Sequence, residues 1–374
     1  MKICSIEGCN REVWDNEKEC VLHCEKLDYS ADYERHILPV FYDALLEYII
    51  AKIKTTHETV IDEGRYRKIL SRHDGIKPEF NPKEDFKYIY LFNIWFPEND
   101  SRDPYDYMKM LKNFQQLHFD SCTFSAKHLE LFGPKVFFNH CRFKSVWHHY
   151  NFNLLENTFG FIYNHCIFDS IVDLSGSEEN PMTFMYSVFY HCKFFDGIMA
   201  NYAYFESYLF EEDLTEKPLD HNKFGISITQ CEFKLPFIID HRTLTICVIL
   251  ASRFNAEFRI SSSQIGNLMI MNCQFKQVSR LIKTQFSEFE MENSMFSDLT
   301  SFEGSSFGVG ESSSDKATRF EFVTFLSFCS FSGTNFLKGL NLHRVSMKET
   351  PNFLNSKVNE RLTDRKSVVQ GKSV

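Results

Sequence analysis

The stretch FDSCTF, residues 119–124, contains the pattern that decides the fold. A cysteine stands two residues before a phenylalanine, and a large apolar residue stands five positions before that phenylalanine. The arrangement recurs at Cys122/Phe124, Cys141/Phe143, Cys166/Phe168, Cys192/Phe194, Cys231/Phe233, Cys273/Phe275 and Cys329/Phe331. A step of five matches neither the 3.6-residue period of a helix nor the two-residue period of a flat strand. It indicates a chain that turns a corner every five residues, and such a repeat outranks other sequence signals.

The repeat also predicts which side chains point inward. The large apolar residues at the centres are Phe119, Phe138, Tyr163, Phe189, Ile228, Ile270 and Leu326. Without cysteine, the same step continues through Leu281, Phe286, Met291 and Phe296. Because side chains alternate along an extended piece, each centre and the small residue two positions before it should face inward. The other three residues of each unit should face outward.

Several units resemble the bacterial pentapeptide-repeat family. They are FDSCTF, FNHCRF, YNHCIF, FYHCKF, TNFLKGLNL and SMFSDLTSFEGSSF, within residues 117–353. The resemblance implies a mainly β fold, a right-handed quadrilateral β-helix in which four units form one square coil. Insertions interrupt the pattern near residues 175–181, 211–222 and 309–317. The fold itself hosts many roles, so it does not specify a function.

The first 26 residues, MKICSIEGCNREVWDNEKECVLHCEK, predict a metal site. Cys4, Cys9, Cys20 and His23 have the spacing C-x4-C-x10-C-x2-H, and three thiolates with one imidazole can complete a tetrahedral zinc shell. A segment this short needs metal binding for its folding energy. The alternatives are Cys24 as the fourth ligand, or an unstructured tail with scattered thiols. Similar short segments precede the repeats in many bacterial pentapeptide-repeat proteins, and the resemblance implies the set Cys4, Cys9, Cys20 and His23. Four protein ligands leave no open position, so we expect structural Zn²⁺.

The predicted organisation has four parts. They are a zinc-knuckle-like segment (1–29), a mixed helical connecting and capping region (30–115), the β-helix (116–353) and a truncated or non-native tail (354–374). The connecting region should contain an amphipathic helix over 30–54 with Pro39 in its first turn, a strand over 88–96, and a capping helix from Asp103 to about Phe114. Residues 366–374, KSVVQGKSV, have no apolar period and resemble translated adaptor sequence.

Composition narrows the classes of function. The chain has 374 residues and a net charge of −9, which argues against a general nucleic-acid binder. No run of 18 apolar residues occurs, so we expect no membrane segment in this chain, and nothing at the N-terminus indicates a secretory signal. Most of the 12 cysteines occupy inward repeat positions or the N-terminal cluster. That usage indicates a reduced, cytoplasmic protein rather than a disulfide framework.

No combination of residues predicts catalysis. His140, His165 and His191 each precede a repeat cysteine, but alternation places them on the outer surface, as a solvated ladder. We therefore predict a non-enzymatic protein-interaction scaffold. Its protein partner is not identified by the sequence, dimerisation is left open, and no direct nucleic-acid contact is expected. One alternative is a DNA-mimic modulator of a topoisomerase such as DNA gyrase. The other is a membrane-associated effector whose C-terminal module is missing from this sequence.

Overall fold

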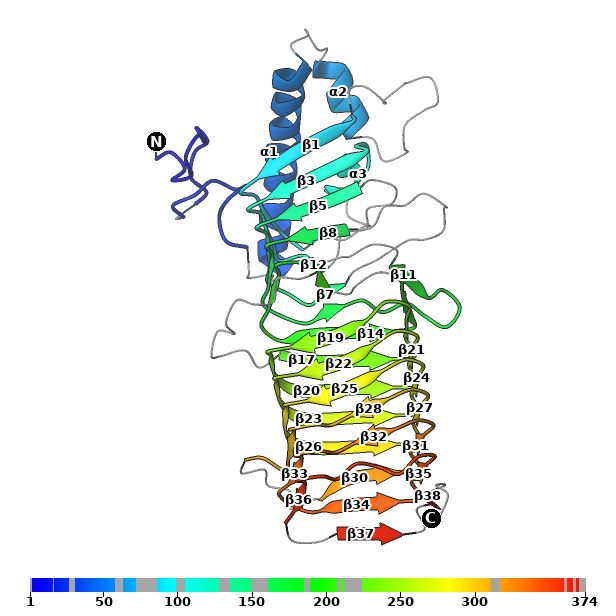
Figure 1. Ribbon diagram of the computed structural model, residues 1–374. Coiled ribbons are helices and arrows are strands. Elements are labelled where there is room, and N and C mark those ends of the chain that lie inside the picture. The colour runs from blue at the N-terminus through cyan, green and yellow to red at the C-terminus, as the bar shows by residue number, and fades with distance from the viewer. Residues whose placement is uncertain are drawn as a thin grey trace. The chain divides into compact units, whose positions relative to one another are not determined.

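A computed structural model shows a mainly β chain with parallel sheets (Figure 1). It describes residues 2–15, 17–26, 31–57, 63–71, 86–98, 105–127, 135–148, 161–184, 189–206, 210–211, 224–310, 317–359, 362–365 and 368–369. The chain divides into two compact units, Met1–Ser170 and Ile171–Val374. No described helix is long and apolar enough to cross a membrane.

The first unit combines three helices with two parallel sheets. The helices are α1 (Ala31–His57), α2 (Glu63–Leu70) and α3 (Met108–Leu111). The strands are β1 (Tyr88–Phe92), β2 (Trp95–Phe96), β3 (Gln116–Asp120), β4 (Thr123–Phe124), β5 (Lys135–Asn139), β6 (Arg142–Phe143), β7 (Trp147–His148), β8 (Phe161–Asn164) and β9 (Ile167–Phe168). Strands β1, β3, β5 and β8 form one sheet in that order, and β2, β4, β6 and β9 form the other.

Each layer of this unit has one residue in the left-handed region, at the turn between its two strands. Ser121, at φ 55°, separates β3 from β4, so FDSCTF is a strand, a corner and a second strand. His140 and His165, each at φ 52°, occupy the same place in the next two layers. Polar residues such as Asn, Asp and His are enriched in this conformation. One corner of each layer is therefore a left-handed turn at a polar residue.

Three expectations for the connecting region need correction. Helix α1 contains Pro39 in its interior instead of its first turn. The φ angle that the proline ring fixes is close to the helical value, and the missing N–H costs the helix one backbone hydrogen bond. The strand expected over 88–96 is two strands, β1 and β2, divided at Asn93 with φ 55°. Parallel pairing thus begins with Tyr88, opposite Gln116. The expected helix from Asp103 is the short α3, and Asp103 itself lies outside the described residues.

The second unit consists of short strands. They are β10 (Val172–Asp173), β11 (Met182–Phe184), β12 (Phe189–Tyr190), β13 (Lys193–Phe194), β14 (Gly197–Asn201), β15 (Ala203–Phe205), β16 (Phe210–Glu211), β17 (Phe224–Thr229), β18 (Glu232–Phe233), β19 (Phe237–Asp240), β20 (Thr243–Leu250), β21 (Arg253–Phe254), β22 (Phe258–Ser261), β23 (Gln264–Met271), β24 (Gln274–Phe275), β25 (Ser279–Ile282), β26 (Gln285–Glu292), β27 (Met295–Phe296), β28 (Thr300–Ser301), β29 (Ser306–Phe307), β30 (Thr318–Glu321), β31 (Thr324–Phe325), β32 (Cys329–Ser330), β33 (Asn335–Phe336), β34 (Leu340–His343), β35 (Ser346–Met347), β36 (Lys357–Val358), β37 (Leu362–Arg365) and β38 (Val368–Val369).

The chain visits three sheets of this unit in a fixed order. Strands β17, β20, β23 and β26 are neighbours in the first sheet, β18, β21, β24 and β27 in the second, and β19, β22, β25 and β28 in the third. Figure 1 shows them layered in chain order. The chain returns to the same sheet after 21 residues. For example, the N–H of Cys273 donates a hydrogen bond to the hydroxyl of Ser294, which is 21 residues later. Although residues 366–374 lack an apolar period, β38 pairs in register with β35.

Inward side chains form columns of stacked rings. In the second sheet, Phe254 stacks on Phe233 at 4.9 Å and on Phe275 at 5.0 Å between ring centroids. In the first unit, Phe124 stacks on Phe96 at 5.0 Å and on Phe143 at 5.1 Å. The predicted inward positions are buried through Leu281, Phe286, Met291 and Phe296. The five-residue step thus identifies the core.

Two inward assignments differ from the structure. Leu326 is 37% exposed, and Phe325 takes the inward place. The reason is ladder pairing: Phe325 lies opposite Phe296 and stacks on it at 5.2 Å, so Phe331 follows six residues later instead of five. Cys192 is half-buried, whereas the other six repeat cysteines are buried.

Candidate metal centre

The first ligand pair lies in a turn closed by backbone hydrogen bonds. The Cys4 N–H donates to the carbonyl of Arg11 at 2.9 Å, and the Cys9 N–H donates to the carbonyl of Ile6 at 3.1 Å. Gly8 precedes Cys9 with φ +79°, a conformation that side chains rarely adopt, although a Cβ there would meet no atom. The backbone therefore favours glycine at this position, and the turn brings Cys4 and Cys9 together.

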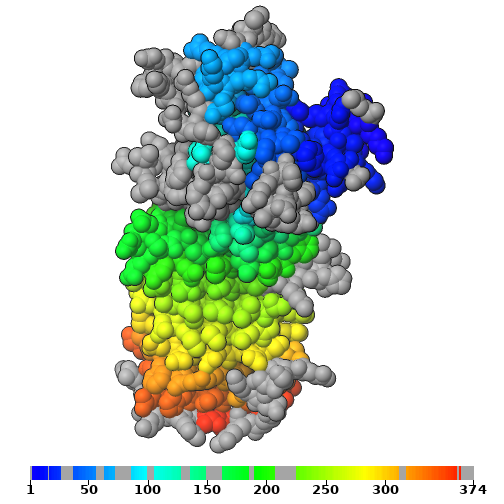
Figure 2. Space-filling model, turned by 180° about the vertical axis from the view of Figure 1, so that it is seen from behind, coloured from blue at the N-terminus to red at the C-terminus, as the bar shows by residue number. Residues whose placement is uncertain are grey.

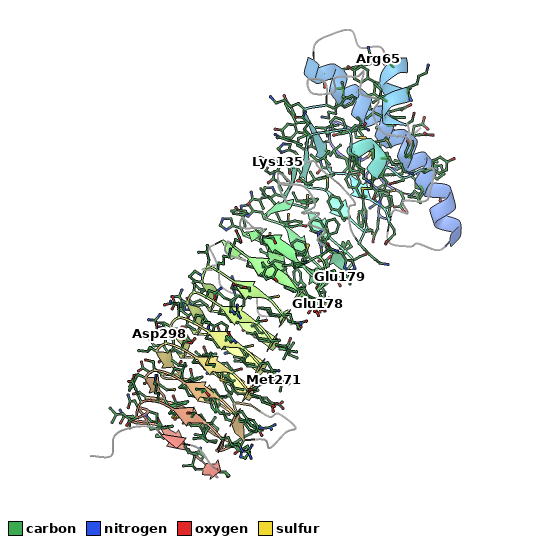
Figure 3. All side chains as sticks on the ribbon, turned by 90° about the vertical axis from the view of Figure 1, so that its right-hand side faces the viewer. Arg65, Lys135, Glu178, Glu179, Met271 and Asp298 are labelled. Atoms are coloured by element: carbon green, nitrogen blue, oxygen red, sulfur yellow. The ribbon has the colours of Figure 1, made fainter. Side chains whose placement is uncertain are left out.

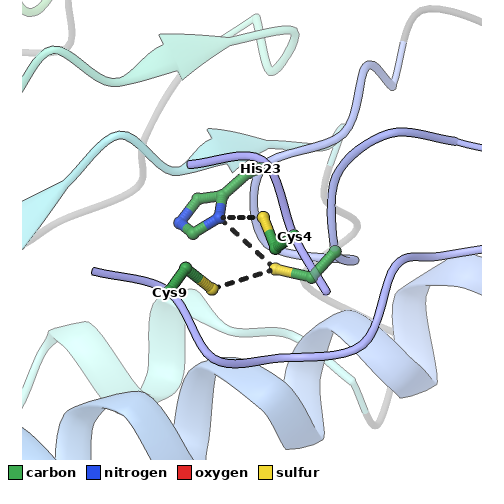
Figure 4. A group of neighbouring side chains, drawn as sticks. Cys4, Cys9 and His23 are labelled. Atoms are coloured by element: carbon green, nitrogen blue, oxygen red, sulfur yellow. Dashed lines mark hydrogen bonds between the residues drawn. The ribbon is translucent and has the colours of Figure 1, made fainter. Parts of the chain in front are cut away.

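The second ligand pair lies in a tight turn that begins at Cys20. The N–H groups of His23 and Cys24 both donate to the carbonyl of Cys20 at 2.9 Å. A bond from the Ser5 N–H to the carbonyl of Lys18, at 3.1 Å, holds this turn beside the first. The two turns together bring the side chains of Cys20 and His23 close to those of Cys4 and Cys9. Figure 4 shows Cys4, Cys9 and His23 in this group.

The donor atoms have the spacing that a four-coordinate ion needs. One donor atom from each of Cys4, Cys9, Cys20 and His23 lies within 4.8 Å of all the others. His23 Nδ1 is 3.3 Å from the Sγ atoms of both Cys4 and Cys20, and the Sγ atoms of Cys9 and Cys20 are 3.8 Å apart. A tetrahedral zinc site with Zn–S bonds of about 2.3 Å has S–S edges of about 3.7 Å. The four residues predicted from spacing therefore lie together and can hold a metal ion.

Cys24, the alternative ligand, is directed elsewhere. Its Sγ faces the carbonyl of Val21 at 4.0 Å, and it is not part of the close group of donors. Helical turn geometry explains the difference, because successive residues in one turn point in different directions. The arrangement favours His23.

Burial shifts the pKa values of His23 and Cys20, with opposite consequences for metal binding in the absence of an ion. It lowers the pKa of His23 to about 4, so the imidazole is neutral at pH 7 and its ring nitrogen can donate to a metal. Burial also raises the pKa of the Cys20 thiol to about 12. A thiolate at Cys20 therefore requires a cation nearby, and a bound divalent ion would provide it.

Hydrogen bonds join residues 2–26 to helix α1 and strand β2, and Figure 2 shows this segment against the part of the surface coloured for α1. Arg11 donates to the carbonyl of Ala44 at 3.2 Å and lies 3.8 Å from the carboxylate of Glu47. The N–H of Trp95 donates to the carbonyl of Leu22, between two ligands, at 2.8 Å. Lys26 is fully buried, and burial lowers its pKa to about 8. No spacing or motif signals this buried lysine, so sequence analysis did not find it.

The other polar candidates stay on the surface. His140, His165 and His191 occupy left-handed corner positions and are exposed. The rings of His140 and His165 stack at 5.2 Å. The acidic pair Glu178 and Glu179 is exposed, beside the strand layers (Figure 3). Within the described residues, the N-terminal cluster is the one group of three or more such side chains placed to hold a metal ion.

Comparison with protein-family models, curated proteins and solved structures found no match to this chain.

Proposed function

We propose that this chain is a non-enzymatic protein-interaction scaffold, stabilised near its N-terminus by structural zinc. The observation that carries the proposal is the division of the repeat into packed inward columns and outward side chains that include charged pairs. Inward rings fill the interior, and inward hydroxyls bond to backbone: Ser305 donates to the carbonyl of Leu281 at 2.7 Å. The outer side chains are what such a fold offers to a partner.

The scaffold would be a right-handed quadrilateral β-helix of the pentapeptide-repeat type. Rings from different sheets meet in one core, which supports this proposal: Phe254 of β21 lies 4.9 Å from Phe258 of β22. Left-handed corners also recur every ten or eleven residues, at Gln230, His241, Ala251, Ser262, Asn272, Lys283 and Asn293. An experimental structure should show four flat sides joined at corners through residues 224–310. Open sheets there would contradict the proposal.

Zinc is the metal that fits the donor set best. Three sulfur atoms and one imidazole nitrogen in a closed four-ligand cluster are typical of structural zinc sites. Calcium and magnesium prefer oxygen ligands, so they do not suit this cluster. The site would therefore stabilise the fold of residues 2–26 without taking part in chemistry.

The outer charges favour a scaffold over a DNA mimic. Acidic side chains are paired with basic side chains of neighbouring layers. Lys234 Nζ lies 2.5 Å from Glu206 Oε1, and Arg319 Nη1 lies 2.5 Å from Glu290 Oε1. Arg142 makes two hydrogen bonds to Asp169 at 2.8 and 3.0 Å. A DNA mimic needs an unbroken acidic stripe, and these pairs interrupt one.

Two assays together test the proposed function. Purified full-length chain is titrated into a gyrase supercoiling reaction, where we expect no inhibition. The same chain, loaded with zinc, is used to capture and crosslink proteins from a bacterial lysate, beside a variant with Glu290→Lys and Glu206→Lys. We expect a saturable partner whose crosslinks map to the outer strands and weaken in the variant. Potent gyrase inhibition, or crosslinks unaffected by the outer charges and by metal removal, would contradict the scaffold proposal.

A further inference from the structure

Lys26 is a buried cation beside the ligand turn. Its side chain is 0% exposed. Its Nζ donates to the carbonyl of Cys24 at 2.8 Å and to that of Leu22 at 3.4 Å. Among the described residues, it has no carboxylate within ion-pair distance. A buried ammonium without an anionic partner is costly, so its place in this fold calls for a counter-charge.

A loaded metal centre would supply that counter-charge. Three thiolates and a neutral imidazole around a divalent ion leave one net negative charge on the cluster. Lys26 follows His23 by three residues, and the carbonyl of Leu22 that it contacts lies between Cys20 and His23. The ammonium is thus fixed to the turn that holds two of the four ligands. Partners outside the ligand set commonly tune metal affinity in this way.

Lys26 also contacts helix α1. Its Nζ lies 5.3 Å from the ring centroid of Phe41, over the ring face. Phe41 is itself buried against Phe96 and Tyr107, at 6.0 and 5.4 Å. A cation held over an aromatic face in a desolvated place is favourable. The same ammonium therefore connects the ligand turn to the core of the first unit.

We propose that Lys26 is a positioning residue that couples metal loading of the Cys4, Cys9, Cys20 and His23 cluster to docking of residues 2–26 on α1. The proposal rests on the metal-binding role given above. When the cluster is loaded, its negative charge stabilises the buried ammonium, and the ammonium in turn holds the ligand turn against Phe41. Without the ion, the described residues offer Lys26 no carboxylate within ion-pair distance and only the more distant charge of Glu19, so docking weakens.

The test compares full-length wild-type chain with Lys26→Met and Lys26→Gln. Methionine keeps an unbranched apolar side chain that is shorter than lysine by the terminal nitrogen, and glutamine keeps a hydrogen-bond donor without the charge. Lys18→Met is the matched control, because Lys18 is exposed on the same segment. Zinc affinity is measured by competition with a chromophoric chelator under reducing conditions. Amide hydrogen exchange of residues 2–26 and α1 is measured with and without zinc.

We expect both Lys26 variants to bind zinc at least tenfold more weakly, with Lys18→Met within twofold of wild type. Zinc should protect α1 amides less in the Lys26 variants than in wild type. In the metal-free chain, Lys26→Met should melt at the same temperature as wild type or higher, whereas a purely structural lysine would lower it. If wild type binds zinc and both variants bind it equally well, the coupling is wrong and the metal site stands. If the wild-type chain binds no zinc, the metal-site proposal and the Lys26 proposal both fail. If Lys26→Met does not fold, the zinc affinity of Lys26→Gln decides between the outcomes.

Discussion

The N-terminal segment (residues 2–26) and the parallel strands of residues 224–310 achieve order in opposite ways. In the strands, each layer repeats the one before it, so the same inward columns are extended many times. The N-terminal segment has a single cluster of four donor atoms within 4.8 Å and few buried side chains. The strands should therefore tolerate small local losses, whereas the segment should depend on one site. Repeat stability is distributed among neighbouring layers, while metal-site stability is concentrated.

The largest expected effect is loss of the metal site. Replacing Cys9 and Cys20 by serine should abolish zinc binding and open residues 2–26 to hydrogen exchange. Structural zinc provides about 10–16 kcal/mol in small finger peptides. Residues 224–310 should keep their protection, because their columns do not include the cluster. Loss of protection in those strands as well would show that the two regions are not independent.

The next effect comes from placing a charge in an inward column. Cys273→Arg should destabilise the second unit by at least about 4 kcal/mol, because an unpaired guanidinium would enter a packed interior. Lys276→Ala, at an exposed position three residues after Cys273 and one after Phe275, should change stability by less than about 0.5 kcal/mol. Cys192→Arg should cost less than Cys273→Arg, since Cys192 is half-buried. Urea unfolding of the three variants measures the order, and equal costs for Cys192 and Cys273 would contradict it.

Neighbouring residues Phe325 and Leu326 sharpen the same comparison. Phe325→Ala should cost about 3–5 kcal/mol, because it removes a ring from a stacked column. Leu326→Ala should cost well under half of that, because its side chain is partly exposed. Denaturant midpoints of the two variants suffice. A larger loss for Leu326→Ala would restore the register that the sequence alone predicts.

A smaller effect depends on pH. Burial lowers the pKa of His23 from 6.5 to about 4, so the folded segment favours the neutral imidazole. In the metal-free chain, this contribution to stability is fully present above pH 6.5 and is lost as the pH falls toward 4. Hydrogen exchange of residues 2–26 should accelerate over that interval in wild type and lose this dependence in His23→Gln. An unchanged profile in His23→Gln would assign the effect to another group.

Much of the fold could be predicted because stacked inward columns require large apolar residues at regular intervals in the sequence. The step of five identified inward residues such as Phe275 and Phe286. It offered two conflicting inward positions in one layer, Phe325 counted forward from Phe320 and Leu326 counted back from Phe331, because one extra residue in that layer shifts the step. The pattern predicts one strand over 88–96, because in the sequence Asn93 resembles any polar residue of a strand and nothing marks the turn there. The sequence predicts Pro39 in the first turn because proline is usually tolerated there, whereas α1 continues on both sides of it.

The ligands of the metal centre could be predicted from the sequence more readily than the residues packed beside them, Lys26 and Phe41. Ligand spacing directly reflects the turns that bring Cys4, Cys9, Cys20 and His23 together. The spacing did not decide between His23 and Cys24, since both follow Cys20 closely, and the direction of the Cys24 thiol toward Val21 separates them. No spacing or motif in the sequence indicates that Lys26 is buried. What packs over its ammonium is Phe41 of α1, and no local pattern relates these two residues.

The most direct test of the account is X-ray absorption spectroscopy at the zinc edge on the purified full-length chain, with metal quantified per chain. The account predicts one zinc ion with three sulfur neighbours at about 2.3 Å and one imidazole nitrogen at about 2.0–2.1 Å. A metal content near zero under reducing conditions, or a shell dominated by oxygen, would contradict it.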